Sequence, residues 1–266
     1  MIADYHIHTR LCKHAGGEME EYVEAAISAG LREMAFTDHI PLPAQFDIAH
    51  RMAENELEHY VLEIERLNAA YPEIKIKTGI EADFYDGFEP YLEQILKRFD
   101  FDLVILSVHF VHGWPEGNWA FSYHFPQRSL KDIYSDYLQA LIRGVKSGLF
   151  DIIGHADLVK SAEQSVLQEN SADLVQLFMA AAKKNMALEM NTSGWRKDIN
   201  EPYPDLNMLP LILEAGLPVT LGSDAHQPRQ VGFRFSDMEK ELRKFDNLEL
   251  AGFEKRKLYR RKLKEI

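Results

Sequence analysis

The chain has 266 residues, of which 46% are hydrophobic and 27% are charged, a composition that excludes disordered and collagen-like chains and allows a sizeable core. Its formal net charge of −12 argues against a basic surface that follows nucleic-acid phosphates, so no nucleic-acid partner is predicted. No stretch approaches the ~20 apolar residues that cross a bilayer, and the N-terminus lacks a signal-peptide pattern, so no membrane association and a cytoplasmic location are predicted.

Short apolar runs rich in β-branched residues alternate with stretches of helical spacing along the whole chain. Seven strands are predicted, within residues 2–8, 33–39, 75–84, 102–110, 150–157, 186–193 and 218–226. Helices are predicted around residues 23–27, 57–67, 87–98, 133–145, 174–181 and 209–213. Ser129 can cap the helix that follows it, and the basic segment 254–266 is predicted to be a solvated helical end.

This alternation predicts an α/β fold with a parallel sheet. Seven strand-helix units without a long linker or a Pro/Gly/Ser tract indicate a closed or nearly closed barrel. We therefore expect residues 1–266 to form a single barrel domain.

Polar side chains that can bind a metal ion or take part in catalysis lie at the carboxyl ends of the predicted strands. They are His6, His8, Asp38, His39, Glu81, Asp83, His109, His155, Asp157, Asn191, Asp224 and His226. In parallel α/β barrels this end carries the active site, which is built from the loops that follow the strands. The pattern therefore aims many ligand-type side chains at one mouth.

His6 and His8 point to the same side of their strand because residues i and i+2 share a face. A single His-x-His is more often a hydrogen-bonded core feature than a metal site. Its repetition at other strand ends favours metal, since burying many titratable groups without a cation costs several kcal/mol per ion. The single cysteine, Cys12, leaves nitrogen and oxygen ligands, which suit two or three divalent ions of Zn, Mn or Fe.

The stretches that carry these residues resemble the polymerase-and-histidinol-phosphatase (PHP) superfamily of metal-dependent phosphoesterases. They are DYHIHTRLCKHA, FTDHIPLP, GIEADF, SVHFVHGW, GHADLVK, NTSGWRK and GSDAH, which follow the family order across residues 4–226. SVHFVHGW and NTSGWRK are similar to the histidinol-phosphate phosphatase branch. The resemblance implies a distorted (β/α)7 TIM-like barrel with a trinuclear metal centre at the carboxyl mouth of the strands.

The resemblance also implies how nine ligands divide among three ions. The first ion would be held by His6, His8, Glu81 and Asp224, and Glu81 would bridge to a second ion held with His109 and His155. The third ion would be held by His14, His39 and His226.

Such a centre implies hydrolysis of a phosphomonoester by a metal-bound hydroxide, because the ions neutralise the dianion and lower the pKa of bound water. The predicted catalytic residues are Asp38, Glu81 and His226. Asp38 is a candidate proton donor to the leaving group, and the alternative is that Asp38 accepts a hydrogen bond from a ligand histidine.

Four further residues are predicted to bind substrate. Arg196 and Lys160 follow strand ends and can contact phosphate, although Lys160 stands where the family often has arginine and Arg196 can instead form a surface ion pair. His112 stands where relatives tend to carry an acidic residue, and Trp114 offers a surface on which an imidazole can stack.

The sequence therefore predicts a histidinol-phosphate phosphatase of histidine biosynthesis, which takes a small phosphomonoester and releases inorganic phosphate. A PHP-type phosphatase for another small phosphomonoester or a nucleotide is the alternative, followed by a phosphodiesterase and by a metal-storage protein. The cations Arg196 and Lys160 argue against storage. The oligomeric state stays open, and a homo-oligomer is compatible with the sequence.

Overall fold

A computed structural model describes residues 3–111, 120, 129–160 and 170–265 of the chain. Each of the seven predicted runs contains a strand. The strands are β1 (Ala3–Asp4), β2 (Glu33–Phe36), β3 (Lys75–Asp83), β4 (Leu103–Ser107), β5 (Ile152–Ile153), β6 (Ala187–Asn191), β7 (Val219–Gly222), β8 (Glu249–Glu254) and β9 (Lys257–Lys262).

Strands β1 to β7 are parallel and follow one another around the sheet in sequence order. The β1 and β7 segments are also joined, because the backbone N–H of Tyr5 donates to the carbonyl of Leu221 (3.0 Å) and that of His8 to Ala225 (2.9 Å). Ile7 and Ala225 form a parallel bridge between these segments. The predicted α/β fold, a distorted seven-stranded TIM-like barrel, is thus confirmed.

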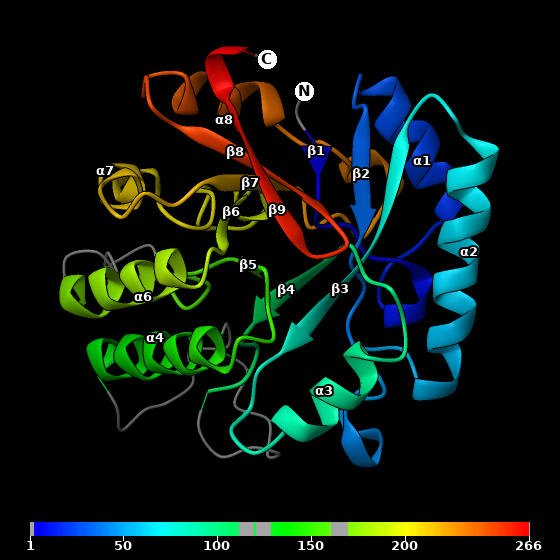
Figure 1. Cartoon of the computed structure of the whole chain (residues 1–266), viewed down its shortest axis with the longest axis horizontal. Helices are drawn as coiled ribbons and strands as arrows, with labels where there is room; N and C mark the ends of the chain where they lie inside the picture. The colour runs from blue at the N-terminus through cyan, green and yellow to red at the C-terminus, as the bar shows by residue number, and fades with distance from the viewer. Residues whose placement is uncertain (1–2, 112–119, 121–128, 161–169, 266) are drawn as a thin grey trace.

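Helices surround the strands (Figure 1). Their bounds are α1 (Met19–Ser28), α2 (Leu57–Ala70), α3 (Glu89–Leu96), α4 (Leu130–Ser147), α6 (Ser171–Lys183), α7 (Leu209–Glu214) and α8 (Phe235–Leu242). The predicted cap of α4 is confirmed, since the Ser129 hydroxyl accepts from the N–H of Asp132 at 3.1 Å.

The prediction of a helical C-terminal end is wrong. Residues Lys257–Lys262 form β9, which pairs antiparallel with β8 in a hairpin that extends the sheet from β7. In this register Leu258 lies opposite Phe253 and Tyr259 lies opposite Gly252, so the hairpin provides partners that the local sequence does not reveal. Exposed charges on β9 also suit an edge strand, because they discourage pairing with another chain.

The inside of the barrel changes from apolar to polar along the strands. On β4, Leu103 and Ile105 belong to an apolar cluster, whereas Ser107 and then His109 continue the same face towards the carboxyl end. The cluster contains Tyr5, Ala35, Leu103, Ile105, Ile152, Ala187, Ala251 and Phe253. This apolar layer closes one end of the barrel and forms the floor beneath the polar residues.

A second, larger apolar cluster packs the helices against the outer faces of the strands. Among the residues that the structure describes, no helix combines the length and the apolarity needed to cross a membrane.

Candidate metal centre

A cavity of about 890 Å³ opens at the carboxyl ends of the strands. Glu81, His109, His155, Asp224 and His226 line it together with His14 and His39. The structure therefore brings the predicted ligand residues to one place, although they are spread over 220 positions of the chain from His6 to His226.

The first predicted group surrounds the carboxylate of Asp224. Its Oδ1 lies 3.2 Å from Nε2 of His8 and 4.0 Å from Nε2 of His6. Glu81 completes the group, with Oε1 at 3.5 Å from Nε2 of His6 and Oε2 at 3.7 Å from Nε2 of His8. His6 and His8 are almost completely buried, so these nitrogens face the carboxylates and not solvent.

The second predicted group lies on the other side of Glu81. Its Oε1 lies 3.1 Å from Nε2 of His155 and 3.6 Å from Nε2 of His109, and it accepts a hydrogen bond of 2.5 Å from the hydroxyl of Ser107. Glu81 thus lies between the first and second groups, as a bridging ligand must.

The third predicted group forms the more exposed edge of the cavity. Nε2 of His14 lies 2.9 Å from Nε2 of His226, so at least one of these two nitrogens carries no proton. Nδ1 of His39 lies 2.7 Å from Oε2 of Glu81, which connects this group to the other two.

Several buried atoms in this cluster have no hydrogen-bond partner among the residues that the structure describes. They include Nε2 of His6, whose nearest carboxylate oxygen, Oε1 of Glu81, is 3.5 Å away. Buried polar atoms without partners are costly, and imidazole nitrogens aimed at carboxylates are suitable ligands for divalent transition metals. The possible ligand atoms of His6, His8 and Glu81, of Glu81, His109 and His155, and of His14, His39 and His226 each lie within 4.8 Å of one another. The residues present therefore fit the predicted ions.

Two carboxylates behind the ligands fix the orientation of the ligand histidines. Oε1 of Glu189 lies 2.6 Å from Nδ1 of His6, and Oε2 of Glu189 accepts from the backbone N–H of His155 at 2.8 Å. Asp83 lies 2.8 Å from Nδ1 of His109. Because these contacts use Nδ1 of His6 and His109, Nε2 is left to face the cavity.

Sequence reasoning missed Glu189. It stands two positions before Asn191, which was among the polar residues at the strand ends, so both face the barrel interior from β6. That alternation is the signal that could have found it.

Electrostatics keep the carboxylates charged and one histidine neutral. Burial alone would raise the pKa of Glu81, but the imidazoles that surround its carboxylate outweigh burial and hold that pKa well below its ordinary value. Burial lowers the pKa of His39 to about 4, despite the opposing effect of Glu81. A charged bridging carboxylate beside a neutral imidazole is the protonation state that a cation requires.

Two ligand candidates have a left-handed backbone conformation that is rare for residues other than glycine. The φ angles are 52° at Asp224 and 21° at His155. Such conformations persist only where the surrounding structure enforces them, and they concentrate at functional sites.

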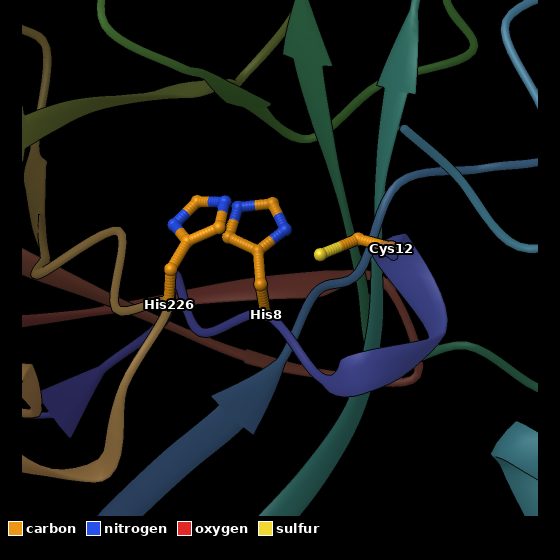
Figure 2. Close-up of side chains that lie close together, drawn as sticks. All are labelled: His8, Cys12 and His226. Carbon is orange, nitrogen blue, oxygen red and sulfur yellow. The ribbon is translucent and has the colours of Figure 1, made fainter. Parts of the chain in front are cut away.

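Cys12 lies beside the cluster. Figure 2 shows its sulfur directed towards the ring of His8, with the ring of His226 on the opposite side of His8. Burial raises the pKa of the Cys12 thiol well above its ordinary value, and a protonated thiol is a poor metal ligand. The nitrogen and oxygen ligand set therefore needs no thiolate.

The predicted cations do not all face the cavity. The guanidinium of Arg196 donates to the backbone carbonyls of Ser223 and Asp224, both at 2.8 Å, and does not line the cavity. Lys160 lines it, but its ammonium is held by the carbonyl of Pro202 and lies 3.3 Å from Asp157. Lys197, which sequence reasoning did not single out, also lines the cavity.

Asp38 is completely buried and does not line the cavity. Its carboxylate accepts hydrogen bonds from the hydroxyl and the backbone N–H of Thr9 and from the N–H of His39, and Oδ1 lies 3.5 Å from Nδ1 of His8. This position agrees with the alternative of a contact that orients a ligand histidine. The predicted substrate residues His112 and Trp114 lie outside the described residues.

A family model described as the PHP domain matches residues 4–193 of the chain. The chain is 40% identical over 243 residues to a protein of Deinococcus radiodurans named probable histidinol-phosphatase, with coverage of 91% of this chain and 93% of that protein. It is 31% identical over 265 residues to the histidinol-phosphatase of Bacillus subtilis, with coverage of 87% and 96%.

A solved structure has a similar fold. It is the crystal structure of a histidinol phosphate phosphatase from Lactococcus lactis in complex with zinc, L-histidinol and phosphate. The TM-score is 0.82 and the sequence identity 26%, with coverage of 97% of this chain and 98% of that one.

Proposed function

The chain belongs to the PHP domain family, and from that premise we propose that it is a metal-dependent phosphatase that hydrolyses L-histidinol phosphate to L-histidinol and inorganic phosphate. One observation carries the proposal: seven histidines and two carboxylates come together in three groups at the carboxyl mouth of the strands. Five of the histidines and both carboxylates line the cavity, and the buried His6 and His8 contact those carboxylates. The names of the Deinococcus and Bacillus relatives and the ligands in the Lactococcus structure support the choice of substrate.

We assign the nine predicted ligands to two or three divalent ions of Zn, Mn or Fe, with Glu81 as the bridge. When bound, such ions neutralise the charge of a phosphate dianion and activate water as a nucleophile. His6, His8, Glu81 and Asp224 would hold one ion, and His109 and His155 would hold a second together with Glu81. The histidines His14, His39 and His226 would hold the third. Glu81 and His226 would therefore act on the reaction through the ions that they would hold.

The other residues of the chain position these ligands and the ester. We assign Asp38 to the orientation of His8, because the pKa of this buried carboxyl is lowered by its contacts with His8, which outweigh the effect of burial. An ionised carboxylate that does not reach the cavity is a poor proton donor to a leaving group.

Phosphate needs cations at the cavity wall as well as metal ions. Lys160 and Lys197 line the cavity and would attract the phosphate oxygens. Arg196 is better placed to fix the backbone at Asp224, because both of its terminal nitrogens are used by carbonyls of that segment. The proposed substrate belongs to histidine synthesis, so a cytoplasmic location is part of this proposal.

The test is phosphate release by the purified chain from a panel of phosphomonoesters. L-histidinol phosphate is compared with a sugar phosphate, a nucleotide and p-nitrophenyl phosphate, and single-stranded DNA is included to detect a phosphodiesterase. We expect kcat/KM for L-histidinol phosphate to exceed every other value at least a hundredfold, and we expect activity to be lost on chelation and restored by Zn or Mn. A kcat/KM for L-histidinol phosphate no better than that for p-nitrophenyl phosphate would refute the proposed substrate.

A further inference from the structure

Arg51 is a buried charge in the segment between β2 and α2. Its side chain is 2% exposed, and it is among the largest buried side chains of the described chain. A buried guanidinium must be matched by acceptors, because the cost of removing it from water is several kcal/mol. The identity of those acceptors therefore indicates what the residue does.

The guanidinium contacts three acceptors. Nη1 donates to the carbonyl of Ile40 at 3.1 Å, and Nε donates to Oδ2 of Asp47 at 3.1 Å. Nη2 lies 2.9 Å from Oδ2 of Asp83. Two of these acceptors belong to the segment that carries Arg51 itself, whereas Asp83 belongs to β3, at the edge of the metal centre.

The two oxygens of Asp83 have different partners. Oδ2 faces Arg51, and Oδ1 accepts from the backbone N–H of His109 at 3.0 Å and lies 2.8 Å from Nδ1 of the same residue. An ionised carboxylate can only accept, so Nδ1 of His109 carries the proton and Nε2 is free to bind a cation.

The geometry would also allow Asp83 to bind an ion directly. Its carboxylate lies with His39 and His109 in a group whose possible ligand atoms are within 4.8 Å of one another. Without a cation on its other side, this buried carboxylate would compete for an ion as a ligand. The guanidinium at 2.9 Å supplies that cation permanently and keeps Asp83 in the role of acceptor.

We propose that Arg51 is a positioning residue of the metal centre, which acts through Asp83 to fix the ring of His109 and to exclude Asp83 from the ligand set. The inference rests on the proposed metal-dependent function, because it assumes that His109 binds an ion. Arg51 also links the centre to the cavity rim, because its partner Asp47 lies 2.6 Å from Nδ1 of His50.

The experiment measures zinc bound per chain, by mass spectrometry, against a series of chelator concentrations. The variants are Arg51→Met, Asp83→Asn and the double variant, with Arg256→Met as the matched control. Arg256 pairs with Asp151 at 2.8 Å at the opposite end of the strands, so its replacement also removes a guanidinium from a carboxylate without touching the cavity.

We expect Arg51→Met to weaken the binding of one zinc by about 10- to 100-fold, the usual effect of losing a partner of a metal ligand. Arg256→Met should bind zinc as the wild type does. In the Asp83→Asn background, Arg51→Met should change the affinity less than threefold, since the two residues act in series.

Folded Arg51→Met with wild-type zinc affinity would overturn the proposal, and so would losses that multiply in the double variant. Should circular dichroism show that Arg51→Met is unfolded, Arg51→Lys replaces it, because lysine keeps the charge but cannot reach all three acceptors. Unaltered zinc binding by Arg51→Lys would then overturn the proposal. Zinc binding is measured without substrate, so failure of the proposed substrate would appear in the phosphatase panel and not here.

Discussion

Replacing Gly222 by alanine tests whether the acceptors behind the ligands maintain the metal centre. Gly222 is the last residue of β7, and a Cβ atom there would lie 1.9 Å from Oε1 of Glu189 and 2.7 Å from Cβ of His6. Both distances are too short for real contacts. The Glu189 carboxylate can move only by leaving Nδ1 of His6, now at 2.6 Å, and the N–H of His155, now at 2.8 Å.

The expected cost follows from those two contacts. Hydrogen bonds to a charged group contribute about 1.5–3 kcal/mol each, so losing both lowers the free energy of unfolding by about 3 kcal/mol or more. For a chain of this size each kcal/mol corresponds to roughly 2–4 °C, so the Tm of the metal-free protein should fall by about 6–12 °C. Zinc affinity should fall about 10- to 100-fold, because His6 and His155 lose their orientation.

Gly216→Ala is the matched control. Gly216 has a φ of +70°, but a Cβ atom added there would meet no neighbouring atom within 4 Å, so alanine introduces backbone strain of about 1 kcal/mol and no collision. Thermal unfolding of the metal-free proteins and competition with a zinc chelator compare the two variants. The reasoning is refuted if Gly222→Ala retains wild-type zinc affinity, or if both variants lose the same stability and neither loses metal.

Three further predictions concern the ligands and their surroundings. Asp224→Ala should lower the zinc content and reduce kcat for L-histidinol phosphate at least a thousandfold, because it removes a charged ligand candidate; a fully active variant would contradict its role. Burial lowers the pKa of His8, but its contacts with Asp224 and Asp38 outweigh burial and raise that pKa to about 9 in the metal-free protein. Zinc must then displace the proton of His8, so zinc affinity should rise up to about tenfold per pH unit between pH 7 and 9. Equal zinc affinities at pH 7 and pH 9 would show that zinc binding displaces no proton from His8. Arg196→Ala should weaken zinc binding by freeing the backbone at Asp224, and a raised KM with unchanged zinc affinity would instead indicate a direct phosphate contact.

The parallel strands could be predicted because each is a short apolar run between helical stretches. β9 could not, because KLYRRK has neither a continuous apolar run nor a clean alternation. Its conformation comes from pairing with β8, a contact that arises only when the chain turns back at Lys255 and Arg256. Pairing between segments is information that a local pattern does not contain.

The common location of the ligand candidates could be predicted because His6, His8, Glu81 and Asp224 sit at strand ends, where the fold directs side chains to one mouth of the barrel. Their division into three groups came from the family resemblance. The partners that a long side chain contacts are harder to predict. Arg196 follows a strand end as a phosphate-binding residue would, but its guanidinium turns to backbone carbonyls. Arg51 lies in an irregular segment, so no periodicity indicates that it reaches Asp83.

Anomalous scattering from a crystal of the protein with zinc and phosphate, measured at the zinc edge, tests the central claim most directly. The account predicts peaks within the cavity, one between His6, His8, Glu81 and Asp224 and another between Glu81, His109 and His155, with phosphate beside them. Zinc bound only on other faces of the molecule, with the cavity free of anomalous signal, would contradict the assignment of these side chains as a catalytic metal centre.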